Sequence, residues 1–89
     1  MQRSVVVALT EGLHARPAAK FVATAASQPV PVSIAKGNGS PVSASSILGI
    51  MTLGVTCGDE VVLTTGTDDD EAARSLDALE QVLLQEDVA

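Results

Sequence analysis

The sequence is poor in aromatic residues and in positive charge, and both shortages argue against nucleic-acid binding. Its 89 residues include no Trp, no Tyr and one Phe, so unstacked bases would find no aromatic platform. The 11 acidic residues outnumber the 5 Lys and Arg, which gives a net charge of −6 at pH 7. Binding to a duplex requires clustered cations, so we expect no nucleic-acid partner.

The chain also has few residues that could form a disulfide or a metal site. Cys57 is the one cysteine, which excludes an intramolecular disulfide and is consistent with a reducing cytosol. His14 is the one histidine, so it has too few companions for a zinc site, and we expect neither a metal nor another cofactor. The acidic run at residues 68–71 lacks the glycine and the spacing of a calcium-binding loop and is interpreted as helix capping.

A long hydrophobic run is missing as well. The apolar segment Val5–Leu9 is too short for a membrane span or for the core of a signal peptide. We therefore expect a cytoplasmic protein with no direct membrane insertion. Hydrophobic residues nevertheless make up 46% of the chain, enough for one modest core of Val, Leu, Ile and Ala. Residues 1–89 are accordingly predicted to form a single domain.

Hydrophobic spacing and turn residues predict seven elements of secondary structure. Ser46 is the expected N-cap of a short helix, and Gly54 is expected to end that helix. Asp68, with Glu71 three positions later, is expected to cap the last helix. The remaining connection at residues 55–59 is expected to be a loop. The predicted elements are strands over residues 3–9, 32–35, near 42 and 60–65, and helices over 16–27, 47–53 and from 68 onward.

The order β-α-β-β-α-β-α predicts an α+β fold. Four strands cannot bury one face alone, and three amphipathic helices would supply the cover. The last helix carries an apolar stripe at helical spacing, made of Ala72, Leu76, Leu79 and Leu83. We therefore expect an open-faced β-sandwich, in which a four-stranded antiparallel sheet is covered on one face by three helices. Residues 85–89 are expected to fray.

The strongest candidate site surrounds His14. Pro17 suits the first turn of a helix, because its ring fixes φ and its missing N–H is not needed there. His14 is therefore expected just ahead of a helix, near its N-cap. The free N–H groups of that first turn and the guanidinium of Arg16 would hold an anion beside the imidazole. A nucleophilic ring nitrogen next to an anion cradle is the arrangement that a phosphoryl acceptor needs.

Two segments of the chain resemble a known family. Residues 12–18, Gly-Leu-His-Ala-Arg-Pro-Ala, are similar to the active-site motif of HPr, the histidine-containing phosphocarrier family of the bacterial phosphoenolpyruvate:sugar phosphotransferase system. Residues 46–54 resemble the second motif of that family at the expected distance, and the resemblance extends over essentially the whole chain.

This resemblance implies an HPr-like fold and a role in sugar transport. His14 would accept a phosphoryl group on Nδ1 from phosphorylated enzyme I and pass it to IIA domains of sugar permeases. The chain would then be a phosphoprotein that acts as a stoichiometric intermediate, not an enzyme, and a monomer is expected.

The resemblance also implies roles for individual residues. Arg16 would stabilise the phosphoryl group during transfer, and the phosphate would be bound by Ala15, Arg16, Pro17 and Ala18. The docking patch for partner proteins would comprise Ala15, Lys20, Ile47, Leu48 and Met51. Ser46 occupies a position that a dedicated kinase phosphorylates in some bacteria, so it is a candidate regulatory phosphosite as well as an expected helix cap.

Two alternatives stay open at this stage. One is a nitrogen-related phosphotransfer paralogue, and the other is a regulatory HPr-like binding module, in which the histidine is replaced and only partner binding survives. The presence of His14 and Arg16 favours a carrier over a binding module. Ser45, Ala23 and Ala26 stand where many relatives have basic residues, so electrostatic steering toward acidic partners should be weaker.

Overall fold

The computed structural model describes residues 1–85 and contains one sheet of four strands, namely β1 (Gln2–Val6), β2 (Val32–Lys36), β3 (Val42–Ser43) and β4 (Glu60–Thr65). The strands pair antiparallel in the spatial order β1-β4-β2-β3. Val5 of β1 is paired with Val61 of β4, and Ile34 of β2 with Leu63 of β4. All four side chains are buried, because side chains two positions apart point to the same face of a sheet.

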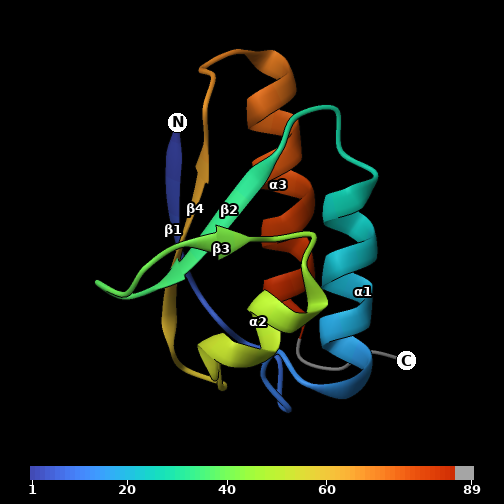
Figure 1. Ribbon diagram of the computed structural model, residues 1–89, viewed down its shortest axis with the longest axis vertical. Helices are drawn as coiled ribbons and strands as arrows, with labels where there is room; N and C mark the ends of the chain where they lie inside the picture. Colours follow the sequence, from blue (N-terminus) through green and yellow to red (C-terminus); the bar gives the residue numbers. More distant parts are fainter. Residues whose placement is uncertain (86–89) are drawn as a thin grey trace.

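Three helices within the same residues cover that face: α1 (Ala15–Ala26), α2 (Ile47–Leu53) and α3 (Asp70–Leu84) (Figure 1). One cluster of buried residues fills the space between helices and sheet, and it includes Phe21, the single aromatic side chain. The expected open-faced β-sandwich is confirmed. The apolar stripe of α3 is confirmed too, since all four of its members are buried.

The first strand is shorter than predicted. It ends at Val6, opposite Glu60, because β4 begins there and offers no further strand partner. The Val7 N–H instead donates to the Asp59 carbonyl at 2.9 Å, and the next N–H along the chain reaches the Leu83 carbonyl. Val7 is nonetheless buried, so the alternation was informative about the core and wrong about the extent of the strand.

Helix ends agree with local signals in α2 and depart from them by one residue elsewhere. The hydroxyl of Ser46 accepts a hydrogen bond from the Gly49 N–H, and Gly54 ends α2 in the left-handed conformation with φ 65°. In α3 the predicted cap at Asp68 is wrong: the carboxylate of Asp69 accepts from the Ala72 N–H at 2.9 Å. Three consecutive aspartates are locally equivalent as caps, and packing of the buried stripe decides which one is used.

The predicted capping box fails for the same reason, because Ala72, and not an acid, stands three residues after the cap. Residue 85 follows the last turn of α3 as its C-cap. The remaining residues of the segment expected to fray, 86–89, lie outside the described part of the chain.

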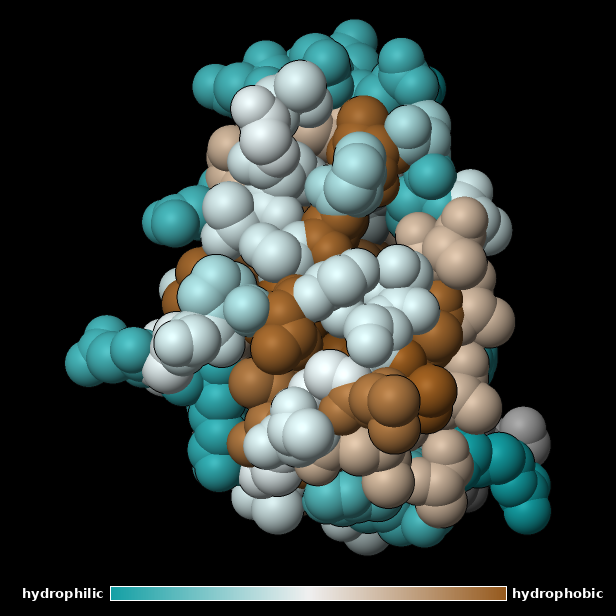
Figure 2. Space-filling view, viewed as in Figure 1, coloured by the Kyte–Doolittle hydropathy of each residue, from teal (hydrophilic) through white to brown (hydrophobic). Residues whose placement is uncertain are grey.

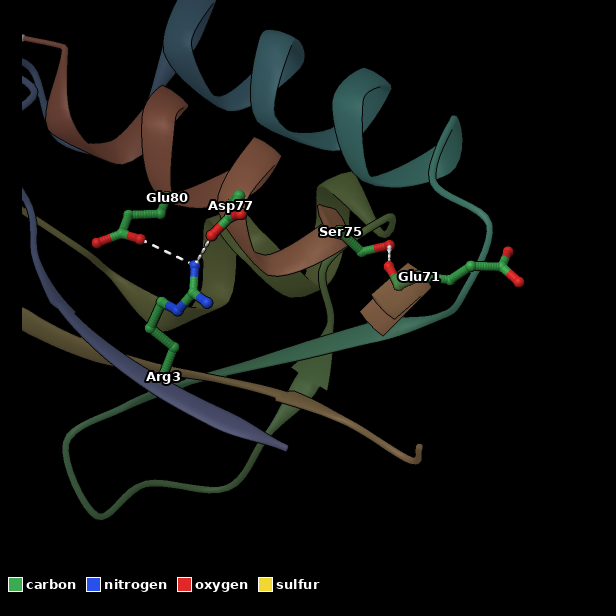
Figure 3. A network of polar contacts seen from close by, with 5 residues as sticks. All are labelled: Arg3, Glu71, Ser75, Asp77 and Glu80. Carbon is green, nitrogen blue, oxygen red and sulfur yellow. Dashed lines mark hydrogen bonds and ion pairs between the residues drawn. The ribbon is translucent and has the colours of Figure 1, made fainter. Parts of the chain in front are cut away.

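Polar contacts join β1 to α3 on the surface (Figure 3). Arg3 donates to the carboxylates of Asp77 and Glu80, the second at 3.0 Å. Nearer the start of α3, the buried hydroxyl of Ser75 donates to the Glu71 carbonyl at 2.8 Å. Ion pairs as exposed as those of Arg3 contribute about 0–1 kcal/mol each. Their main consequence here is that Arg3 is already occupied and is not a free cation.

Candidate functional site

His14 is the N-cap residue of α1, in agreement with its predicted place ahead of a helix. Its backbone is extended (φ −131°, ψ 160°), and its carbonyl accepts a hydrogen bond from the Ala18 N–H at 3.4 Å. The imidazole is half-buried and makes no hydrogen bond or ion pair with any of residues 1–85. Both ring nitrogens are therefore available to a partner.

The first turn of α1 offers an anion two free backbone donors. Pro17 is the third helical residue, not the first, and it has no N–H. The Ala18 N–H is directed at the His14 carbonyl. The N–H groups of Ala15 and Arg16 have no hydrogen-bond partner among residues 1–85, so these two remain at the positive end of the helix dipole.

Ala15 holds the most unusual backbone conformation of the site. Its φ is 51°, and it is the one non-glycine residue with positive φ among residues 1–85. A residue with a side chain in this region costs roughly 1–2 kcal/mol, so surrounding contacts must impose the conformation. It sets the direction in which the chain leaves His14 and enters α1. No local signal predicts it, because alanine is the best helix former.

Arg16 supplies the free positive charge next to His14. Its side chain is exposed, and the guanidinium makes no hydrogen bond or ion pair within residues 1–85. Arg3 and Lys36, in contrast, are engaged by carboxylates. A planar guanidinium two residues from the imidazole could bind two oxygens of a phosphoryl group at once.

The loop that carries His14 rests on residues 55–59, which were expected to be a plain loop and instead form a hydrogen-bonded turn. The Leu13 N–H donates to the Val55 carbonyl at 3.1 Å. One carboxylate oxygen of Asp59 accepts from the N–H and the hydroxyl of Thr56, at 2.8 and 2.9 Å. The spacing of Thr56 and Asp59 is a local signal for such a turn and could have revealed it. Lys36, 3.3 Å from the same oxygen, could not have been found this way.

The predicted docking patch is exposed. Ile47, Leu48 and Met51 have 44%, 77% and 47% of their surface accessible, whereas Ile50 on the same helix is fully buried. Hydrophobic side chains gather over α2 in Figure 2, and Figure 1 shows α2 beside the end of α1 that begins at Ala15. Lys20 is exposed on α1 and donates to the Gln85 side chain at 3.1 Å. Three large apolar side chains in the open are a feature of partner surfaces.

Other regions within residues 1–85 offer little evidence of a second functional site. A groove of about 490 Å³ is lined by residues of β2, β3 and β4 and their flanks, and it includes none of the predicted site residues. Within residues 1–85, no three His, Cys, Asp or Glu side chains come together where they could hold a metal ion. A helix with the length and apolar character to cross a membrane is likewise not found in that part of the chain.

Known proteins resemble this chain over most of its length. Residues 1–84 match the family PTS-HPr, described as the PTS HPr component phosphorylation site. The chain is 50% identical over 72 residues to the phosphocarrier protein HPr of Streptomyces coelicolor, covering 81% of this chain and 77% of the relative. It is 44% identical over 82 residues to the HPr-like protein Crh of Bacillus subtilis, covering 91% of this chain and 95% of that protein.

Solved structures show the same likeness. The crystal structure of a phosphocarrier protein HPr from Bacillus anthracis has a TM-score of 0.84 and 38% identity, and the match covers 93% of this chain and 95% of the other. An HPr dimer from Thermoanaerobacter tengcongensis has a TM-score of 0.65 and 42% identity, with 80% and 78% covered.

Proposed function

Because the chain belongs to the HPr family of phosphocarrier proteins, we propose that it carries a phosphoryl group on His14 between two partners in the phosphotransferase system. The donor is the phosphohistidine of enzyme I, which is charged by phosphoenolpyruvate, and the acceptors are IIA domains of sugar permeases. The observation that supports this best is the unengaged imidazole at the N-cap of α1, two residues from the unengaged guanidinium of Arg16.

Each transfer exchanges one phosphorus–nitrogen bond for another. The lone pair on Nδ1 of neutral His14 attacks the phosphorus, the bond to the donor ring breaks, and its electron pair stays on the donor imidazole. The guanidinium of Arg16 and the N–H groups of Ala15 and Arg16 would stabilise the charge on the oxygens that do not react. Transfer to a IIA domain repeats these events with the roles of the rings exchanged. The chain is regenerated unchanged, so it acts as a stoichiometric carrier and not as an enzyme.

The docking patch is assigned to both partners. Ile47, Leu48 and Met51 present apolar surface beside the start of α1, and Ala15 and Lys20 extend that surface along α1. Methionine adapts to surfaces of different shape, which suits a carrier that meets a donor and several acceptors in turn.

Ser46 is proposed as a regulatory site next to the patch. Its hydroxyl caps α2 through the Gly49 N–H at 3.1 Å. A phosphate here would meet the positive end of a helix, so the fold should tolerate it. It would also add about −2 of charge beside Ile47, where an acidic partner would be repelled.

A second candidate is a regulatory binding module, because the chain is similar to the HPr-like protein Crh of Bacillus subtilis, a catabolite repression HPr. A nitrogen-related phosphotransfer paralogue is a variant of the carrier proposal with other partners. The presence of both His14 and Arg16 supports a carrier over a module that only binds.

We further propose that residues 1–89 act in the cytoplasm as one monomeric domain. Within residues 1–85 the buried hydrophobic residues form one cluster, which supports one domain. A mass of 9.0 kDa at sedimentation equilibrium would support the monomer, and twice that mass would contradict it.

The deciding experiment is incubation with enzyme I and labelled phosphoenolpyruvate. The chain should acquire one phosphate that is labile in acid and stable in base, as a phosphohistidine is, and His14→Ala should acquire none while it keeps the wild-type circular dichroism spectrum. A wild-type chain that stays unlabelled but still binds partner proteins would favour the binding module. Equal labelling of the variant would refute His14 as the acceptor.

A further inference from the structure

The turn between α2 and β4 is closed by a single carboxylate. Asp59 Oδ2 accepts from the N–H and the hydroxyl of Thr56, at 2.8 and 2.9 Å, and the Asp59 N–H donates back to the Thr56 carbonyl at 3.1 Å. The hydrogen bond from the Thr56 N–H is the main reason why the pKa of Asp59 lies below its ordinary value. The acceptor is therefore an ionised carboxylate at neutral pH, which makes stronger hydrogen bonds than a neutral oxygen does.

A lysine from another strand secures the turn from outside. Lys36, the last residue of β2, has its Nζ 3.3 Å from Asp59 Oδ2. The same ammonium donates to the carbonyl of Gly54 at 3.1 Å, where α2 ends. One cation thus joins the end of the helix that carries the docking patch to the carboxylate of the turn.

This turn holds the backbone at two points ahead of His14. Before the loop, the Val7 N–H donates to the Asp59 carbonyl at 2.9 Å, and the Val7 carbonyl accepts from the Gly58 N–H at 2.8 Å. Closer to the histidine, the Leu13 N–H donates to the Val55 carbonyl at 3.1 Å. Leu13 immediately precedes His14. The position of the Val55 carbonyl therefore fixes the backbone from which the imidazole of His14 extends.

We infer that Asp59 is a positioning residue for phosphoryl transfer: its carboxylate keeps the turn at residues 54–59 closed, and the turn orients His14 through the hydrogen bond between Leu13 and Val55. This inference rests on the proposed function. Asp59 touches no reacting atom. Its effect is on alignment of the ring nitrogen with phosphorus, and a misplacement of about 1 Å in such an alignment costs on the order of a hundredfold in rate.

The test is Asp59→Ala, assayed as the acceptor in the enzyme I reaction with phosphoenolpyruvate in excess. We expect kcat to fall about tenfold and KM to stay within about twofold, because the apolar side chains that dock are on α2 and remain in place. Hydrogen exchange at the Leu13 amide should accelerate more than that at amides in β4. Asp59→Asn keeps an oxygen for the Thr56 N–H and should recover most of the lost rate.

Asp68→Ala is the matched control. Asp68 is an exposed aspartate ahead of α3 that makes no hydrogen bond or ion pair with residues 1–85, so its removal should leave kcat, KM and Leu13 exchange unchanged. If Asp59→Ala does not fold, Thr56→Val takes its place, because it removes the hydroxyl bond to the carboxylate and keeps the N–H bond. That variant should lower kcat about threefold.

Each outcome separates this inference from the proposed function. Wild-type kcat in Asp59→Ala, together with faster exchange at Leu13, would show that the turn does not orient His14, and the inference would be wrong. A rise in KM alone would assign the turn to docking and would overturn it as well. A wild-type chain that accepts no phosphoryl group would refute the proposed function. A fall in kcat that is confined to Asp59→Ala would support both the inference and the proposed function.

Discussion

Replacement of Gly12 by alanine tests the contact between the His14 loop and the turn that supports it. Gly12 has φ 68°, and a Cβ atom built on it would lie 2.4 Å from the Val55 carbonyl oxygen and 2.8 Å from the Thr56 Cα. Both neighbours are backbone atoms that cannot rotate away. Either the loop or the turn must therefore move when a methyl group is added.

The cost has two parts that the structure separates. An alanine in the left-handed region costs roughly 1–2 kcal/mol. Overpacking a rigid surface costs typically about 1–3 kcal/mol more. Gly12→Ala should thus lower the free energy of unfolding by about 2–5 kcal/mol, which is a large share of the stability of a domain of this size and corresponds to roughly 4–8 °C in Tm per kcal/mol.

Gly54→Ala is the matched control for the conformational part. Its φ is 65°, almost the same as at Gly12, and no atom lies within 4 Å of the added Cβ. Gly54→Ala should therefore lower the free energy of unfolding by about 1–2 kcal/mol, with no contribution from overpacking. Urea unfolding followed by far-ultraviolet circular dichroism is the suitable assay, because the chain has neither Trp nor Tyr for fluorescence. The difference between the two variants measures the close approach alone.

The two variants should also differ in function. Gly12→Ala displaces the segment that carries Leu13, so acceptance of the phosphoryl group should slow at temperatures where the variant is still folded. Gly54→Ala leaves the Leu13 segment in place. If both variants lose the same stability, the contact of Gly12 with Val55 is not tight in solution, and the account of how this loop is supported is refuted.

Four further predictions have distinct outcomes. Leu48→Asp should change stability by no more than about 0.5 kcal/mol and weaken binding to enzyme I, whereas Ile50→Asp should unfold the chain; equal melting temperatures would contradict the assigned exposure. Arg16→Lys should lower the transfer rate about tenfold and leave docking unchanged, because the single ammonium cannot bind two oxygens; rapid-quench kinetics measure this. Ser46→Ala should cost about 1 kcal/mol of stability, and Ser46→Asp little, when both are compared by thermal melting. Asp59→Asn should be less stable than wild type at neutral pH and nearly equal at low pH. A lowered pKa in the fold adds stability above the ordinary value, and this stability is lost as pH falls through the folded pKa, so melting at several pH values checks the sign.

Local chemistry predicted those elements whose ends are marked by residues close in sequence. The helix α2 begins and ends where Ser46 and Gly54 indicate, since a side-chain cap and a left-handed glycine act within one turn. The position of His14 at the start of α1 and the buried stripe of α3 were predictable for the same reason. The family resemblance extended this to roles for His14 and Arg16, and those roles stay predictions until transfer is measured.

The sequence by itself thus determined the element order, the buried faces and the placing of the imidazole ahead of a helix, because each depends on interactions within a few residues. Only the tertiary structure decided where β1 ends, which aspartate caps α3, and that Ala15 adopts positive φ. It also decided that Lys36 and Asp59 form an ion pair at the turn between α2 and β4. These features depend on strand pairing and on packing between distant segments, and no local pattern of residues specifies which distant partner will be present.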